Sequence, residues 1–186
     1  MRIVALGDSL TAGYGLKAED GFTARLQAAL RAKGLPAEVV NAGVSGDTSA
    51  GGLARINSVV KTAPDVVIVE LGSNDGLRGL DPDVTFGNLD ALLARLDEAG
   101  VKTLLAGTLA PPNLGREYGD EFDAVFPRLA RKHDVAFYPF FLDGVAADPA
   151  LNQQDGLHPN AEGVRRIVAG IMPHLLPLVE RAKHGD

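Results

Sequence analysis

Short apolar runs alternate with amphipathic stretches along the whole chain, and this alternation constrains the fold more than any other feature. The runs Ile3–Leu6 and Val66–Val69 are apolar at every position, as in strands buried on both faces of a parallel sheet. The stretches between the runs place apolar residues three and four positions apart, which is the spacing of amphipathic helices. The predicted strands cover residues 3–6, 38–40, 66–69, 103–106 and 135–138, and the predicted helices cover 22–33, 49–62, 84–99, 121–133 and 161–181.

Five β-α repeats of this kind predict a single α/β domain over residues 1–186. Parallel strands need crossover connections, and right-handed crossovers through helices cover both faces of the sheet. We therefore expect a three-layer α/β/α sandwich around a flavodoxin-like, five-stranded parallel sheet. The longest irregular stretch, residues 109–120, is rich in Pro and Gly, and a loop of this length in a compact domain is often functional.

The composition excludes several kinds of site. The chain has no cysteine, so disulfides, zinc–thiolate sites and a thiol nucleophile are ruled out. Its net charge of −6 and the lack of a long Lys/Arg run argue against a nucleic-acid partner. No apolar run approaches the roughly 20 residues that span a bilayer, so stable membrane insertion is not expected.

The amino terminus bears on where the protein works. Met1 and Arg2 lead directly into the first predicted strand, without a basic region followed by a long apolar stretch. As written, the chain is therefore expected to be cytoplasmic. A periplasmic or secreted protein that had lost its signal peptide would have the same sequence. We expect a monomer or a weak oligomer.

In an open parallel sheet, ligands bind beyond the carboxyl ends of the strands. Ser9 lies there, directly after the first predicted strand, and a serine hydroxyl becomes a nucleophile only when a base removes its proton. Of the four histidines, His158 stands out because it lies in a polar loop before a helix. Asp155, three residues earlier, can fold back and accept from the ring N–H, which would complete a Ser-His-Asp triad. A helix cap at Ser9 and a plain turn around His158 are the alternatives.

Acyl transfer also needs hydrogen-bond donors for a developing oxyanion. Gly46 can present a main-chain N–H without a side chain in the way. Asn74 carries a side-chain amide just after the third predicted strand, and the N–H of Ser9 is a third candidate. Each of these residue types is also common in turns. The prediction depends on all these segments lying at the same edge of the sheet.

Four ordered motifs carry a resemblance to a known family. The chain resembles the SGNH, or GDSL, hydrolases over nearly its whole length, and details around the second and third motifs are similar to the bacterial multifunctional arylesterases, acyl-CoA thioesterases and lysophospholipases. The motifs are Gly7-Asp8-Ser9-Leu10, Gly46 within Val44-Ser45-Gly46-Asp47-Thr48, Gly72-Ser73-Asn74-Asp75, and Asp155-Gly156-Leu157-His158-Pro159.

The resemblance implies a serine hydrolase that cleaves carboxylic esters and thioesters, such as aryl esters, acyl-CoA and lysophospholipids, with no metal and no cofactor. It implies Ser9 as nucleophile with Asp155 and His158 as its partners, and Ser9, Gly46 and Asn74 as the oxyanion hole. It further implies that a mobile loop after the third motif and the loop from residue 109 line an open acyl groove. The implied substrate-binding residues are Asp75, Gly76, Leu77, Leu109 and Pro111. One departure is Ser73, where this subgroup commonly has Gly.

Other functions fit the sequence less well. A carbohydrate acetyl esterase of the same family is the nearest alternative. A nucleotide-binding protein would need a glycine-rich motif, but Gly46 and Gly51 are followed by Gly52-Leu53 rather than by Lys and Ser/Thr. A flavodoxin-like, non-enzymatic signalling module would need an acceptor Asp at the tip of the third strand, where Leu71 and Gly72 lie. A metal hydrolase would need a second His at ligand spacing from the first.

Overall fold

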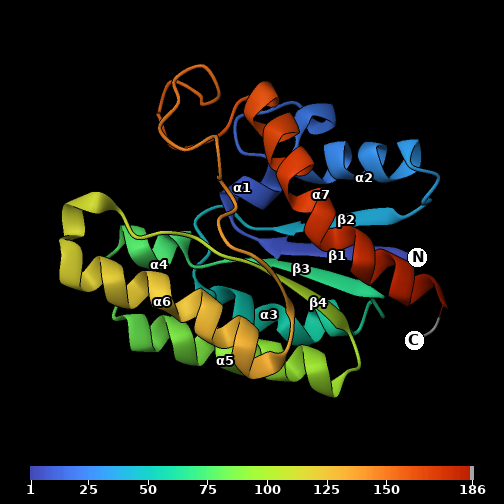
Figure 1. Cartoon of the computed structure of the whole chain (residues 1–186), viewed down its shortest axis with the longest axis horizontal. Helices are drawn as coiled ribbons and strands as arrows, with labels where there is room; N and C mark the ends of the chain where they lie inside the picture. The colour runs from blue at the N-terminus through green and yellow to red at the C-terminus, as the bar shows by residue number, and fades with distance from the viewer. Residues whose placement is uncertain (185–186) are drawn as a thin grey trace.

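The computed structural model describes residues 1–184 and contains one sheet of five parallel strands (Figure 1). The strand order is β2-β1-β3-β4-β5, and every neighbouring pair is parallel. The strands are β1 Arg2–Gly7, β2 Glu38–Gly43, β3 Val66–Glu70, β4 Lys102–Ala106 and β5 Ala136–Tyr138. The predicted parallel five-stranded α/β/α fold is confirmed.

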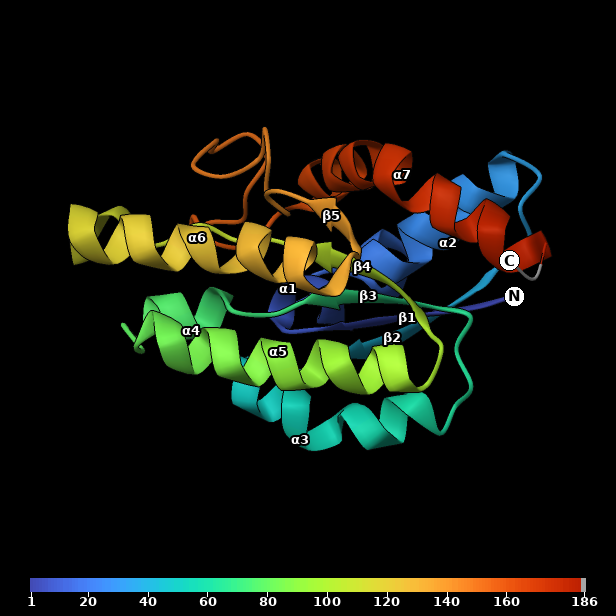
Figure 2. The same cartoon turned by 60° about the horizontal axis from the view of Figure 1, so that its bottom comes forward.

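Helices cover both faces of the sheet, as Figure 2 shows for α2 and α7 on one side and α3 and α5 on the other. The long helices are α2 Phe22–Ala32, α3 Ser49–Val60, α5 Pro82–Glu98, α6 Arg116–His133 and α7 Ala161–His184. Side chains of β3 alternate between the two cores. Val66 and Ile68 pack with α2 and α7, whereas Val67 and Val69 pack with α3, α5 and α6. This period of two on a fully buried strand explains why β3 has no polar face.

Two short helices that the sequence pattern does not predict lie at the carboxyl edge of the sheet. They are α1 Ser9–Ala12, directly after β1, and α4 Ser73–Leu77, after β3. Two 3₁₀ helices, η1 Ala18–Asp20 and η2 Pro112–Leu114, lie in the connections. Segments this short cannot show a hydrophobic period, so their helical form is set by caps and tertiary contacts.

Helix α6 begins at Arg116, five residues before the predicted start, and the irregular stretch 109–120 is correspondingly shorter. Its first turns are polar and exposed, with 93% of the Arg116 side chain accessible, so they lack the apolar spacing that marks a helix. Helix α5 also begins earlier than predicted, at Pro82, because the Asp81 side chain caps it by accepting from the N–H of Asp83 at 2.9 Å.

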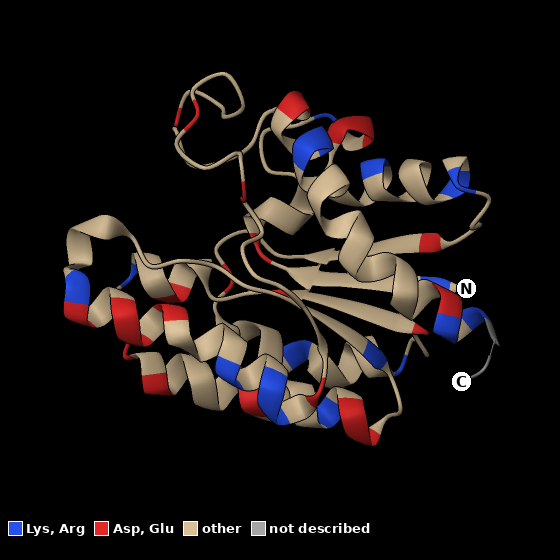
Figure 3. Ribbon diagram, viewed as in Figure 1, with Lys and Arg blue, Asp and Glu red and all other residues tan. Residues whose placement is uncertain are grey.

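Charged residues of both signs are mixed over the helices, as Figure 3 shows. The strands between them carry few charges, in keeping with their burial in two apolar cores. Within residues 1–184, no helix combines the length and the apolar character that crossing a bilayer requires.

Truncating a buried side chain of the central strand, β3, should lower the free energy of unfolding substantially. Ile68 on β3 is fully buried, and Ile68→Ala removes packed methyl groups and leaves a cavity, so we expect a loss of about 2–5 kcal/mol. Val84→Ala on α5 is the control, because Val84 is 52% exposed and its truncation should change stability by less than about 0.5 kcal/mol. Urea denaturation measures both, and equal losses would show that the sheet core is not where the stability lies.

Candidate active site

Ser9 is held in a tight turn between β1 and α1. The Asp8 carboxylate caps α1 by accepting from the N–H of Leu10 at 2.9 Å, which makes Ser9 the first helical residue. Gly7 ends the strand, and a Cβ at this position would lie 2.0 Å from the hydroxyl oxygen of Thr11. The turn can therefore close only over a glycine.

The loop between β5 and α7, orange in Figure 1, lies close to α1 and brings the predicted triad together across 149 residues of sequence. His158 Nε2 lies 2.9 Å from Ser9 Oγ, and His158 Nδ1 lies 2.6 Å from Asp155 Oδ2. The ring of Tyr14 packs against the His158 ring with 4.6 Å between centroids. These contacts form one hydrogen-bonded chain from carboxylate to imidazole to hydroxyl, which can carry a proton from Ser9 to His158.

Asp155 is fixed by its main-chain neighbours as well as by the imidazole. Its Oδ1 accepts from the N–H of His158 at 3.0 Å and from the N–H of Leu157 at 2.9 Å. These donors and the His158 side chain stabilise the anion and lower the pKa of Asp155 to about 2. The carboxylate therefore stays ionised at any pH near neutrality, and its second oxygen, Oδ2, holds the imidazole through Nδ1.

Main-chain donors lie beside the nucleophile. Gly46 has a φ of +81°, in a turn closed by the N–H of Asp47 on the carbonyl of Val44 at 3.0 Å. Such a conformation favours glycine. Within residues 1–184, the N–H groups of Ser9 and Gly46 make no hydrogen bond to other protein groups. Both groups line the same pocket and can donate to a ligand.

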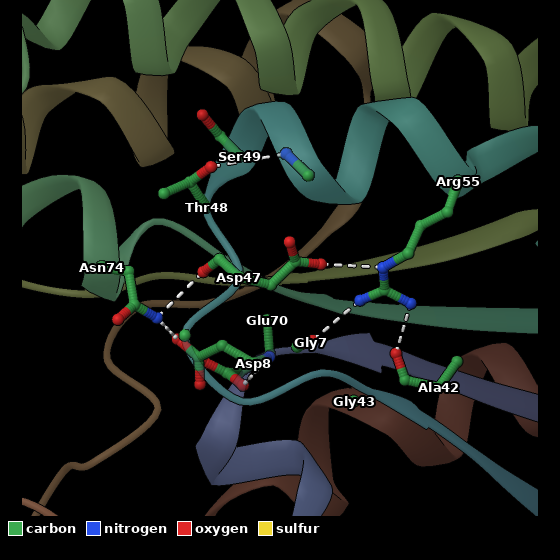
Figure 4. A network of polar contacts seen from close by, with 12 residues as sticks. Gly7, Asp8, Ala42, Gly43, Asp47, Thr48, Ser49, Arg55, Glu70 and Asn74 are labelled. Carbon is green, nitrogen blue, oxygen red and sulfur yellow. Dashed lines mark hydrogen bonds and ion pairs between the residues drawn. The ribbon is translucent and has the colours of Figure 1, made fainter.

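Asn74, on α4, projects its amide into a polar network at this edge (Figure 4). Its Nδ2 donates to Asp8 Oδ2 at 3.0 Å and to the Asp47 carbonyl at 2.9 Å. Asp47 is itself held by Arg55, whose guanidinium also donates to the carbonyls at the ends of β1 and β2. The amide of Asn74 is thus fixed in the pocket wall by two acceptors.

A cavity of about 630 Å³ opens onto these groups. Ser9, His158, Gly46 and Asn74 form its polar side. Its remaining walls are mostly apolar and include Leu77, Leu109, Pro111, Leu142 and Leu157. Leu77, Leu109 and Leu157 are about half exposed. A cleft with apolar walls and a few convergent polar groups is typical of a small-molecule site.

Comparison with known proteins places the chain in a family. The family model of the GDSL-like lipase/acylhydrolase family matches residues 5–166. This chain belongs to that family. Esterase TesA of Pseudomonas aeruginosa is 40% identical over 178 residues, which cover 95% of this chain and 89% of that protein. The family member of Escherichia coli strain K12 named thioesterase 1/protease 1/lysophospholipase L1 is 41% identical, over 95% of this chain and 84% of its own length.

A solved structure of TesA agrees with the whole architecture. It superposes with a TM-score of 0.92 at 40% sequence identity and covers 96% of this chain and 99% of the TesA chain. This member of the GDSL-like family therefore shares the entire α/β/α layout with that protein, including the edge of the sheet at which Ser9 lies.

Two of the predicted substrate-binding residues do not line the cavity. Asp75 is fully buried and accepts from the main-chain N–H of Ser49 at 2.8 Å, from its hydroxyl, and from the hydroxyl of Thr85 at 3.2 Å. Gly76 packs against Phe122 and Pro111. The expectation of a loop is the source of this error, because the segment is helical and turns Asp75 and Gly76 away from the pocket. Asn74 and Leu77 share the pocket face.

The other predicted positions lie at the cavity, together with residues that the sequence did not single out. Leu109 and Pro111 line its wall, and their role in substrate binding stays a prediction. Tyr14, Leu142 and Leu157 also line the wall, although the sequence analysis did not name them. Tyr14 lies beyond the end of α1, after the left-handed Gly13, and no sequence signal used above marks it. Ser73, the departure from the subgroup, donates its hydroxyl to Thr108 Oγ1 at 3.3 Å, which ties α4 to the loop after β4.

Asp155→Asn should abolish most activity by imposing the wrong imidazole tautomer. The two main-chain N–H groups on Oδ1 will retain the amide oxygen there, so the amide NH₂ must face His158 Nδ1. The ring then carries its proton on Nε2 and cannot accept one from Ser9, and kcat should fall on the order of 10⁴-fold. Asp148→Asn is the matched control, because Asp148 caps the N–H of Ala150 in the same loop. Steady-state ester hydrolysis measures both, and comparable losses would contradict the tautomer argument.

Proposed function

We propose that this protein hydrolyses carboxylic esters and thioesters through an acyl-enzyme on Ser9. The observation that carries the proposal is the hydrogen-bonded chain from Asp155 through His158 to Ser9 Oγ, at the polar side of an apolar cavity. The family to which the chain belongs, described as lipases and acylhydrolases, agrees with this chemistry.

In the first step, Ser9 Oγ attacks the acyl carbon while His158 Nε2 accepts the hydroxyl proton. Asp155 stabilises the resulting imidazolium. The tetrahedral oxyanion accepts hydrogen bonds from the N–H groups of Ser9 and Gly46 and from the amide of Asn74. Collapse expels the alcohol or thiol, which takes its proton from His158. Water then attacks the acyl-enzyme by the same route and releases the acid.

The substrates are small acyl esters and thioesters with an apolar acyl group. The leucine-rich walls of the cavity favour an alkyl or aryl group over a sugar, which supports aryl esters, acyl-CoA and lysophospholipids ahead of carbohydrate acetyl esters. The names of the E. coli relative include thioesterase and lysophospholipase, in line with this range. We infer action without a nucleic-acid partner, given the net charge of −6, and as a monomer or weak oligomer.

Ser9→Ala should remove turnover and leave the fold intact, since it deletes only the nucleophilic oxygen. Losing a triad nucleophile cost on the order of 10⁶-fold in a well-studied protease, so we expect activity near background. A fluorophosphonate should label Ser9 in the wild type, and mass spectrometry of the peptides identifies the site. Labelling of a different serine, or full activity of the alanine variant, would falsify the assignment. Activity in EDTA should equal activity without it, because no step uses a metal.

The apolar wall should set the preference for acyl length. Leu109→Ala removes three carbon atoms from a wall residue that is about half exposed. A fully buried methylene contributes about 0.8 kcal/mol, so half-burial of three leaves about 1.2 kcal/mol, and kcat/KM for an eight-carbon p-nitrophenyl ester should fall close to tenfold. For the two-carbon ester, whose acyl group has little apolar surface to bury, we expect kcat/KM to be nearly unchanged. Val84→Ala on α5 is the control, because Val84 is not among the residues that line the cavity. A uniform loss over all chain lengths would mean that Leu109 does not contact the acyl chain.

A further inference from the structure

Two carboxyl groups lie buried together beneath the nucleophile turn. Asp8 is 1% exposed, and Glu70, the last residue of β3, is 2% exposed. Glu70 Oε2 accepts from the main-chain N–H of Asp8 at 3.4 Å, so the two residues are direct neighbours. Two adjacent buried carboxylates cannot both be ionised without a large penalty, so the pair must hold a proton near neutral pH. The mechanism proposed above uses neither group directly.

The hydrogen-bond partners identify which member of the pair holds the proton. Both oxygens of Asp8 accept from N–H groups, Oδ1 from Leu10 at 2.9 Å and Oδ2 from the Asn74 amide at 3.0 Å. These contacts require acceptor atoms and suit an anion. In Glu70, by contrast, only Oε2 is an acceptor for other groups of residues 1–184, for the Thr11 hydroxyl at 2.8 Å and the Asp8 N–H at 3.4 Å. The other oxygen of Glu70 is available to carry the proton.

The electrostatics agree with this assignment. Burial raises the pKa of both groups, to about 6 for Asp8 and well above the usual range for Glu70, where the neighbouring Asp8 charge raises it further. Three other charged or titratable groups act on the pair. His158 lowers the pKa of Asp8, Asp47 raises it, and Arg55 neutralises Asp47 through a 2.8 Å ion pair. The direction of both shifts therefore favours a proton on Glu70 and an ionised Asp8.

We propose that Glu70 is a positioning residue for the reaction: as a neutral acid it donates to Asp8, and the Asp8 anion in turn fixes the Asn74 amide in the pocket wall (Figure 4). The inference rests on the proposed function in one respect, that Asn74 stabilises the oxyanion. Glu70 does not touch substrate. It acts through two hydrogen bonds, and its place at the end of an otherwise apolar strand is explained by this task.

Two substitutions of Glu70 test whether its hydrogen-bond donor, rather than a negative charge, is needed for activity. Glu70→Gln keeps a neutral side chain with an N–H donor, so kcat should stay within about threefold of the wild type. Glu70→Leu removes the donor, frees Asp8 to shift and misplaces Asn74. Losing one oxyanion donor lowers kcat by roughly 10²- to 10³-fold. Displacing the Asn74 amide without removing it should therefore lower kcat by about 10- to 100-fold, with little change in KM. If the two variants lose equal activity, the proposal is wrong.

A double-mutant cycle tests whether Glu70 acts through Asn74. In an Asn74→Ala background, Glu70→Leu should lower kcat by less than about threefold, because the group that it positions is gone. A merely structural role would reduce activity by the same factor in both backgrounds, and that result would overturn the proposal.

Infrared spectroscopy tests the protonation state without reference to activity, and it remains decisive if Glu70→Leu fails to fold. At neutral pH, the wild type minus Glu70→Gln difference spectrum should contain the carbonyl stretch of a neutral carboxylic acid, shifted in D₂O. A difference spectrum with carboxylate bands alone would refute a neutral Glu70. Failure of the proposed function is separate, because it would appear as a wild type that neither hydrolyses esters nor labels at Ser9.

Discussion

The hydrogen-bonded register between β1 and β3 is the constraint on which the site depends. It pairs Gly7 with Glu70, so β1 and β3 end at the same level and the segments that follow them begin side by side. On β3, alternation sends Glu70 to the face where α1 lies, the same face as Val66 and Ile68, and there it meets Thr11. A slip of one residue would send Glu70 to the opposite face and would leave Asp8 without its partner. The apolar sequence of the strands, which enforces the register through two cores, thus also positions polar groups at their ends.

The site contains two carboxyl environments in which the pKa values are shifted in opposite directions. Asp155 is near solvent and accepts two main-chain N–H groups, which keeps it an anion with a pKa of about 2. Asp8 and Glu70 are buried and adjacent, and desolvation is the largest cause of their raised pKa values. One acidic group is therefore suited to stabilise a transient imidazolium, and the pair is suited to hold a static donor network with only one net charge.

Much of this arrangement could be predicted from the sequence, for identifiable reasons. The strands could be located because their burial on both faces requires continuous apolar runs, and the carboxyl-edge rule then brought Ser9 and His158 to one place. The turn from Asp155 to His158 was predictable because it is local. The failures concern short or exposed helices. Because the sequence pattern does not predict α4, it places Asp75 and Gly76 in a loop that faces substrate. In the structure both residues are helical and buried. The carboxyl pair was not predicted, because its two members are 62 residues apart and become neighbours only through the register.

The resting state of Asn74 bears on how the oxyanion site can discriminate between states of the reaction. Both hydrogens of its amide are engaged, one by the Asp8 carboxylate and one by the Asp47 carbonyl. The neutral carbonyl oxygen of a bound ester is a weaker acceptor than a carboxylate and gains little from competing for either hydrogen. A tetrahedral oxyanion carries a full charge and can share one of them. In the proposed mechanism, Asn74 would thus interact more strongly with the transition state than with the substrate, which is the condition under which a hydrogen bond raises kcat rather than merely tightening binding. A substrate oxygen can bind the Asn74 amide only by competing with the Asp8 carboxylate and the Asp47 carbonyl, and a charged oxygen competes better than a neutral one. The same two acceptors hold the amide in place before the substrate binds.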